Sequence, residues 1–194
     1  MKEIAIQIPN GKKVEWVNNV LTLVDETPKD NRPVTERVKT FEDACRELGE
    51  DHQLVCAYKE LLSTATREDF LIEVFGSDTV SYLKLRIIAA ALNEGWEPQF
   101  TEDECRWYPW FTLWTEEELK EKTEEWKEEH SLWLFGGNSY VGSNCGLADS
   151  ASYHAWSNSL ASLSARLAVK SKELAVYFGK QFIGTWADYV LIKK

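Results

Sequence analysis

The residues that could carry out nucleophilic catalysis in this chain lie between positions 145 and 154. Cys145 could supply a thiolate and His154 a general base, with Asp149 between them as a carboxylate that orients the imidazole. Their spacing matches none of the common nucleophile motifs. We therefore predict that the protein is not an enzyme, and a cysteine-dependent enzyme ranks third among three functional hypotheses.

The other potential ligand residues do not form a recognisable metal or cofactor site. The four cysteines have no CxxC or CxH spacing, which structural zinc sites use. His130 directly follows Glu128 and Glu129, and residues one or two apart do not share a helix face. The glycines at 136–137 and 142–146 precede no Lys-Ser/Thr pair. The sequence predicts no metal and no cofactor.

Binding is the chemistry that the sequence favours, and its candidate surface lies at residues 136–165. These thirty residues include eight Ser, four Gly and three Asn, with aromatic residues at intervals. Tyr and Trp give a large contact area for few rotatable bonds, while Ser, Asn and Gly adapt their hydrogen bonds. The predicted binding residues are Tyr140, Asn144, Tyr153, His154, Trp156 and Asn158. Alternatively, the aromatic residues form the inward face of strands and belong to the core.

The charge of the chain limits the classes of partner. The formal net charge is −10, and proteins that bind nucleic acid nonspecifically, or anionic membranes, depend on basic side chains. Nucleic acid is therefore disfavoured, although a small basic patch at residues 166–180 keeps that option open. Residues 1–25 have no signal-peptide pattern, and no run of about eighteen apolar residues occurs. We expect a cytoplasmic protein without a transmembrane segment.

The first forty residues predict a separate N-terminal region. Ile4, Ile6 and Ile8 alternate as in a strand up to a turn signal at 9–11, and a similar pattern continues around Asn18-Asn19. We expect an N-terminal β-hairpin region over 1–25, a polar linker over 26–39 and a single α+β domain over 40–194.

The middle of the chain has helical periodicity. A capping box at Thr40 predicts a helix to residue 48, followed by a second helix near 54–62 and a short third element at 70–75. Ser77 is expected to cap the most apolar helix, which Gly95 should end in the left-handed conformation. This helix should be central to the core.

The C-terminal half predicts a sheet and a closing helix. Residues 107–114 form an aromatic strand that Pro109 restricts to a sheet edge or a bulge. A charged helix should follow from Thr115 to about His130, with an apolar stripe every seven residues, and a strand at 163–169. Ser171 should cap one long final helix. The predicted fold class is α+β: an N-terminal β-hairpin, a helical middle, and an antiparallel sheet with a long C-terminal helix packed on it.

Several short motifs resemble a family of uncharacterised proteins from Bacteroidetes prophages and mobile elements. They are Leu-Asn-Glu-Gly-Trp-Glu-Pro at 92–98, Tyr-Pro-Trp-Phe at 108–111, Cys-Gly-Leu-Ala at 145–148, Ala-Arg-Leu-Ala-Val-Lys-Ser at 165–171 and Glu-Leu-Ala-Val-Tyr-Phe-Gly-Lys-Gln-Phe at 173–182. None of these motifs is catalytic, so the resemblance implies a biological context and no activity.

Together these features favour a non-enzymatic binding or interaction module of phage or mobile-element origin. Its partner would be a host or phage protein, or a small ligand. The second hypothesis is an acidic regulator or inhibitor that engages a basic host protein or a nucleic-acid enzyme through residues 116–129. Neither hypothesis determines the oligomeric state.

Overall fold

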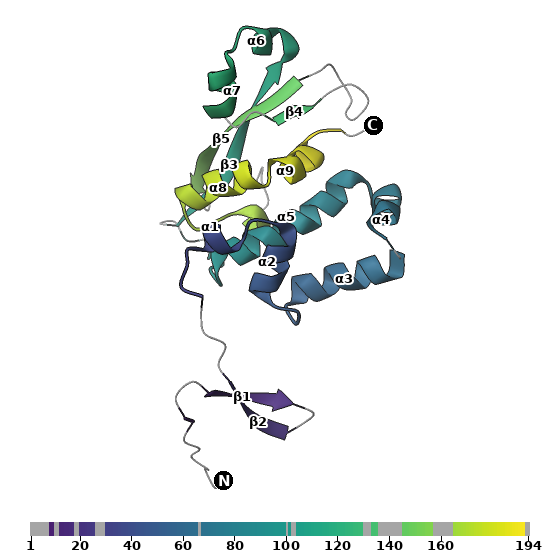
Figure 1. Cartoon of the computed structure of the whole chain (residues 1–194), viewed down its shortest axis with the longest axis vertical. Coiled ribbons are helices and arrows are strands. Elements are labelled where there is room, and N and C mark those ends of the chain that lie inside the picture. The colour runs from purple at the N-terminus through teal and green to yellow at the C-terminus, as the bar shows by residue number, and fades with distance from the viewer. Residues whose placement is uncertain are drawn as a thin grey trace. The chain divides into compact units, whose positions relative to one another are not determined.

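The computed structural model describes residues 8–9, 12–17, 20–25, 30–65, 67–99, 101, 104–129, 133–135, 145–156 and 165–192; for 133–135 and 145–156 it describes the backbone. The chain divides into two compact units, residues 1–32 and residues 33–194 (Figure 1). In the described part of the chain, no helix has both the length and the apolar character needed to cross a bilayer.

The first unit contains a two-stranded antiparallel hairpin, as predicted for this region. Strand β1 (Lys12–Val17) pairs with β2 (Val20–Asp25), so Trp16 lies opposite Leu21. Residues 18 and 19, which join the two strands in the sequence, lie outside the described residues. The strand expected over Ile4 to Ile8 lies almost entirely outside the described residues.

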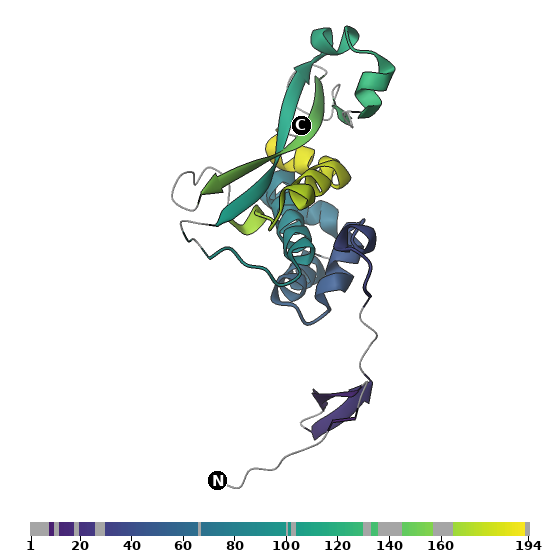
Figure 2. The same cartoon turned by 90° about the vertical axis from the view of Figure 1, so that its left-hand side faces the viewer.

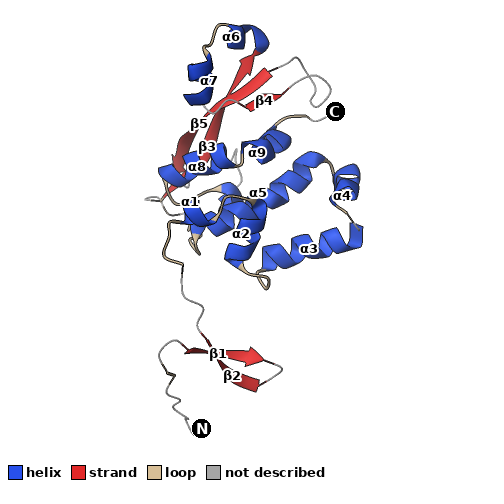
Figure 3. Cartoon of the chain, in the orientation of Figure 1, coloured by secondary structure: helices blue, strands red, loops and turns tan. Residues whose placement is uncertain are grey.

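The second unit begins with five helices: α1 (Val34–Arg37), α2 (Phe41–Leu48), α3 (Gln53–Ala65), α4 (Glu68–Phe75) and α5 (Ser77–Asn93) (Figure 3). Helix α1 lies in the stretch expected to be a linker. Val34 and Val38 are buried in the core, because residues four apart share a helix face. Residues 33–39 thus belong to the larger unit.

The ends of these helices follow the predictions in part. The capping box is confirmed: the Asp43 amide donates to Thr40 Oγ1, and the Thr40 amide donates to the Asp43 carboxylate. The predicted Ser77 cap is wrong, because Gly76, with φ of 87°, ends α4 and directly precedes α5. Only one residue separates the two helices, so Ser77 is already helical. At the other end of α5, Glu94 takes the left-handed conformation, with Gly95 also at positive φ.

A three-stranded antiparallel sheet follows, in the order β3-β5-β4. Its strands are β3 (Cys105–Thr115), β4 (Trp133–Phe135) and β5 (Cys145–Trp156). The effect predicted for Pro109 is confirmed, since β3 is an edge strand and its register with β5 shifts between Trp110 and Thr112.

The charged segment after β3 forms two helices and not the single one expected. Helix α6 (Glu116–Lys120) ends where Thr123 begins to cap α7 (Glu124–Glu129), by accepting a hydrogen bond from the Trp126 amide at 3.2 Å. The seven-residue spacing therefore does not describe one helical stripe. Leu119 is buried, Trp126 packs edge-on against Trp114, and Trp133 lies in β4.

The strand expected at 163–169 is also wrong. Residues Ala165–Leu167 form a 3-10 helix, η1, and Val169 makes a single antiparallel bridge with Trp107. The alternating pattern misleads because Leu167, Ala168 and Val169 are all buried in succession.

The C-terminal helix begins as predicted, with the Leu174 amide donating to Ser171 Oγ. It is divided into α8 (Lys172–Gln181) and α9 (Ile183–Val190), because Phe182 leaves helical geometry. Gly179 and Gly184, which have low helix propensity, flank this point.

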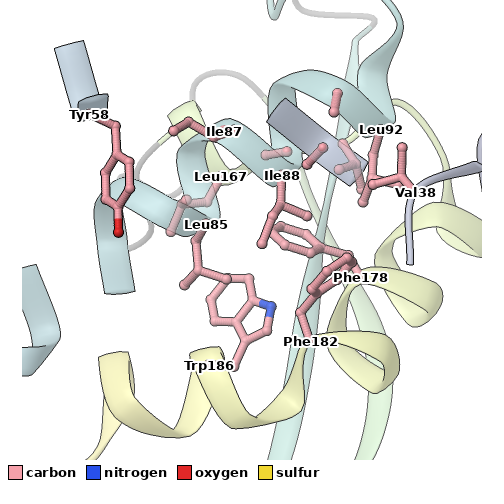
Figure 4. Close-up of a cluster of buried hydrophobic side chains, with 14 of the residues drawn as sticks. Val38, Tyr58, Leu85, Ile87, Ile88, Leu92, Leu167, Phe178, Phe182 and Trp186 are labelled. Atoms are coloured by element: carbon pink, nitrogen blue, oxygen red, sulfur yellow. The ribbon is translucent and has the colours of Figure 1, made fainter. Parts of the chain in front are cut away.

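The core of the larger unit forms around α5, which contacts most of the other helices. Helix α8 packs between the β3–β5 ribbon and α5, as Figures 1 and 2 show. Side chains of α5 meet Phe178, Phe182 and Trp186 from α8–α9 in the cluster of Figure 4. These results establish an α+β fold with a C-terminal helix packed on the sheet.

Candidate functional site

The structure describes only part of the predicted binding segment. Tyr140, Asn144 and Asn158 lie outside the described residues. Tyr153, His154 and Trp156 lie in β5, where the register places them opposite Tyr108, Trp107 and Cys105 of β3. Their backbone is thus part of the sheet, and their assignment to a binding surface stays a prediction.

The same register separates the two residues of the possible catalytic pair. Cys145 lies opposite Thr115 at one end of β5, and His154 lies opposite Trp107 near the other end. Nine residues of extended strand correspond to roughly 30 Å at 3.3 Å per residue. The strand therefore holds the backbones of Cys145 and His154 far apart within one chain.

Helix α4 has an apolar composition, but several of its large apolar side chains are exposed to solvent. Five of its eight residues are large and apolar, from Phe70 to Phe75, so no single face of the helix can bury all of them. Helices that are apolar all round are normally buried in a core. Here Leu71 faces the core, while Phe70, Val74 and Phe75 remain 46%, 54% and 52% exposed.

These exposed side chains form one wall of a groove. We define the α3–α4 groove by its lining residues, which are Ala57, Glu60, Leu61, Thr64 and Ala65 of α3 and Phe70, Leu71, Val74 and Phe75 of α4. Its volume is about 580 Å³ and its surface is mostly apolar. Contiguous apolar surface of this kind marks interaction sites in soluble proteins.

Carboxylates lie on both helices that form the groove. Glu60 lines it from α3, and Glu73 is exposed on α4 one helical turn after Phe70. Asp69 is also exposed on α4, but helical geometry places it on the side away from the lining residues. None of the three carboxylates forms a salt bridge with another residue that the structure describes. The groove is thus apolar, with Glu60 in its lining and Glu73 beside Phe70 as an acidic rim.

A polar anchor fixes α4 against the rest of the fold. Glu68 accepts hydrogen bonds from Tyr58 Oη at 2.8 Å and from Lys84 Nζ at 2.7 Å, so it joins α3, α4 and α5. Burial alone would raise the pKa of Glu68, but the hydrogen bonds from Lys84 and Tyr58 lower it below its ordinary value. The groove therefore has a rigid backing that does not involve its exposed residues.

The acidic face of residues 116–129 is built differently. Glu117, Glu121, Glu125 and Glu128 are exposed there, and Lys122 lies over the Trp114 and Trp126 rings at 4.6 and 4.9 Å. This arrangement presents a charged surface in which one lysine covers two indole rings.

The groove was not predicted as a binding site, although its residues were assigned to a helix and to a short element after it. The available signal was the run from Phe70 to Phe75 in a helix too short to be apolar on every side. Periodicity places such residues on a helix, but it does not tell which of them lack a covering neighbour.

The comparisons with known proteins give no further assignment. No protein-family model, curated protein or solved structure matches the chain. The resemblance to Bacteroidetes prophage proteins therefore stays a prediction.

Proposed function

We propose that the protein is a non-enzymatic interaction module that holds an amphipathic helix of a partner protein in the α3–α4 groove. The observation that carries this proposal is the exposure of Phe70, Val74 and Phe75 on a helix that is otherwise fixed to the core. An apolar groove between two helices is the usual receptor for the apolar face of a third helix, whose contacts recur at i, i+3, i+4 and i+7.

The rim of the groove defines the chemistry of this partner. Glu60 and Glu73 favour a helix with Lys or Arg beside its apolar face, and the net charge of −10 speeds the approach of a basic partner. The same carboxylates disfavour a second copy of this chain, because both copies would bring acidic rims together. A phage or host protein with such a helix fits both requirements.

A peptide-display selection tests the proposal with a defined probe. Helical sixteen-residue peptides with randomised positions are selected against the full chain, with the Phe75→Ser variant as the counter-target. Selected peptides should share an apolar stripe with helical spacing and basic flanks. The absence of enrichment, or equal binding to Phe75→Ser, would overturn the proposal.

Matched variants distinguish binding in the groove from nonspecific binding to exposed apolar residues elsewhere. Val190 of α9 is exposed to a similar degree but lies outside the groove, so Val190→Ser should bind the selected peptides normally. Charge reversal at Glu73 should weaken binding of the basic peptides, while reversal at Glu125 in α7 should not.

The Glu125 variant also tests the acidic regulator hypothesis. If reversal at Glu121 and Glu125 abolishes binding and reversal at Glu60 and Glu73 does not, residues 116–129 form the interface. Sedimentation velocity of the free chain provides a further check. A dimer that dissociates on Phe75→Ser would assign the groove to self-association and contradict the proposal.

A further inference from the structure

A second pocket lies on another part of the larger unit and differs from the groove in its chemistry. It has a volume of about 360 Å³ and opens between α5, the turn at 94–98 and η1. Arg86 and Arg166 line it together with Trp96, Glu97 and Pro98. Two guanidinium groups against one carboxylate give this pocket a positive side-chain charge in a chain whose net charge is −10.

The wall formed by α5 and η1 is held by buried hydrogen bonds. Asn93, 5% exposed, donates from Nδ2 to the Ala168 carbonyl at 2.8 Å and accepts at Oδ1 from the Lys170 amide at 3.0 Å. Glu94 forms ion pairs with Arg37 at 2.5 Å and with Lys170 at 2.8 Å. The pocket is thus formed before any ligand binds, which lowers the entropic cost of binding.

The turn that positions Trp96 contains one residue in a costly backbone conformation, Glu94, followed by a glycine at positive φ. Glu94 is left-handed, with φ of 49°, and Gly95 has φ of 87°. A non-glycine residue in this region is maintained only where its surroundings fix it, and such residues concentrate at functional sites. The Trp96 amide then donates to the Asn93 carbonyl at 2.9 Å, and the half-buried Trp96 side chain packs against Tyr108 and Ala168.

Arg86 is the side chain of the pocket that has an unmatched hydrogen-bond donor. Its guanidinium carbon lies 5.9 Å from the centre of the Tyr82 ring, and its Nε is buried without a hydrogen-bond acceptor among the described residues. Leaving a buried donor unmatched is unfavourable, and the guanidinium fork fits the oxygens of carboxylates and phosphates. The geometry points to a binding site for a small planar organic anion, with its acid group at Arg86 and its ring against Trp96.

The residues that line the pocket account for both the ring and the acid group of this ligand. The volume falls in the range of small-molecule sites, and Leu54, Ala90 and Ala165 add apolar contacts beside the indole. A free inorganic anion would leave these surfaces uncovered, whereas a neutral ring would leave the Arg86 guanidinium without an acceptor. A ring that carries a carboxylate or a phosphate satisfies both.

NMR titration of the full chain tests the site with four probes: 2-naphthoate, 2-naphthyl phosphate, neutral 2-naphthamide and inorganic phosphate. The readout is the indole N–H signal of Trp96, assigned with Trp96→Phe. Saturable binding of either naphthyl acid, with the amide and inorganic phosphate at least about tenfold weaker, supports the site. The stronger of the two acids identifies the acid group. Equal binding of the neutral amide, or no binding of either acid, overturns the proposal.

Substitutions test whether the acids bind at Arg86. Arg86→Met keeps the aliphatic packing and should weaken binding of the acids by about tenfold or more, and Arg86→Lys should recover part of the loss. Arg67→Met, in the turn before α4, is the matched control and should bind normally. Phe75→Ser should also leave this binding unchanged, because the inference does not depend on the α3–α4 groove. Unchanged affinity in Arg86→Met would refute the site.

Discussion

Helices α8–α9 and helix α4 carry similar aromatic side chains, which are buried in α8–α9 and exposed on α4. Phe178 of α8 is fully buried, Trp186 of α9 is 2% exposed, and their ring centroids lie 5.0 Å apart. Phe70 and Phe75 of α4 are each about half exposed. The difference lies in which elements surround these helices. Helices α8–α9 meet α5 on one side and the sheet on the other, whereas α4 has α3 and α5 and an open third side.

This contrast separates stability from recognition. Closing α8–α9 over α5 removes apolar surface from water within the chain, which stabilises the fold. The outward side of α4 leaves apolar surface in contact with water, and this surface can contribute to affinity only when a partner covers it. The sealed region and the open region should therefore respond differently to the same type of substitution.

The largest effect is expected in the sealed region. Phe178→Ala leaves a cavity among Phe182, Trp186 and α5, and should lower the free energy of unfolding by about 3–5 kcal/mol. Urea denaturation measures this change. A loss below about 1 kcal/mol would show that α8 is not the closing element of the core.

The corresponding substitution in the open region should affect binding and not folding. Phe75→Ala removes a half-exposed ring, so the free energy of unfolding should change by less than about 1 kcal/mol. Affinity for a selected helical peptide should fall by about 2 kcal/mol, or roughly 30-fold. Calorimetric titration provides the affinity. Strong destabilisation by Phe75→Ala would place this ring in the core and remove the contrast.

The anchor between the regions should have an intermediate effect. Tyr58→Phe removes the hydrogen bond to Glu68 and should cost about 1 kcal/mol. Because the anchor orients α4, peptide binding should weaken slightly as well. Hydrogen exchange of α4 amides can reveal this local loosening, and unchanged protection in α4 would show that its position does not depend on Tyr58.

The smallest expected effect is the pH dependence of the stability that Glu68 of α4 contributes. The folded-state pKa of Glu68 is lowered, so its contribution to stability is complete above the ordinary glutamate value near 4.3 and is lost as the pH falls through the lower folded value. Unfolding free energy measured from pH 7 to pH 3 should decline in this window. Lys84→Met should make the decline smaller, because it removes a hydrogen bond to the ionised carboxylate. An equally steep decline in Lys84→Met would assign the acid sensitivity to other carboxylates, such as Asp43.

The sequence by itself determined features that depend on neighbouring residues. The Thr40 box and the Ser171 cap are local hydrogen bonds, and the edge position of β3 follows from the missing amide of Pro109. The central helix α5 was also predictable, since apolar residues cover most of its circumference. These assignments required no knowledge of distant segments.

Only the tertiary structure decided what covers each apolar surface. The alternation at 163–169 looks like a strand, but burial between α5 and the edge of β3 makes it a 3-10 turn and one bridge. The pocket at Arg86 depends on segments that are distant in sequence, as the hydrogen bonds between Asn93 and residues 168–170 illustrate. The exposed side of α4 depends on which elements pack against that helix, and α3 and α5 cover only part of it. Hydrophobic periodicity indicates which residues are apolar and would be stabilised by burial. The packing of distant elements determines which of them are actually buried.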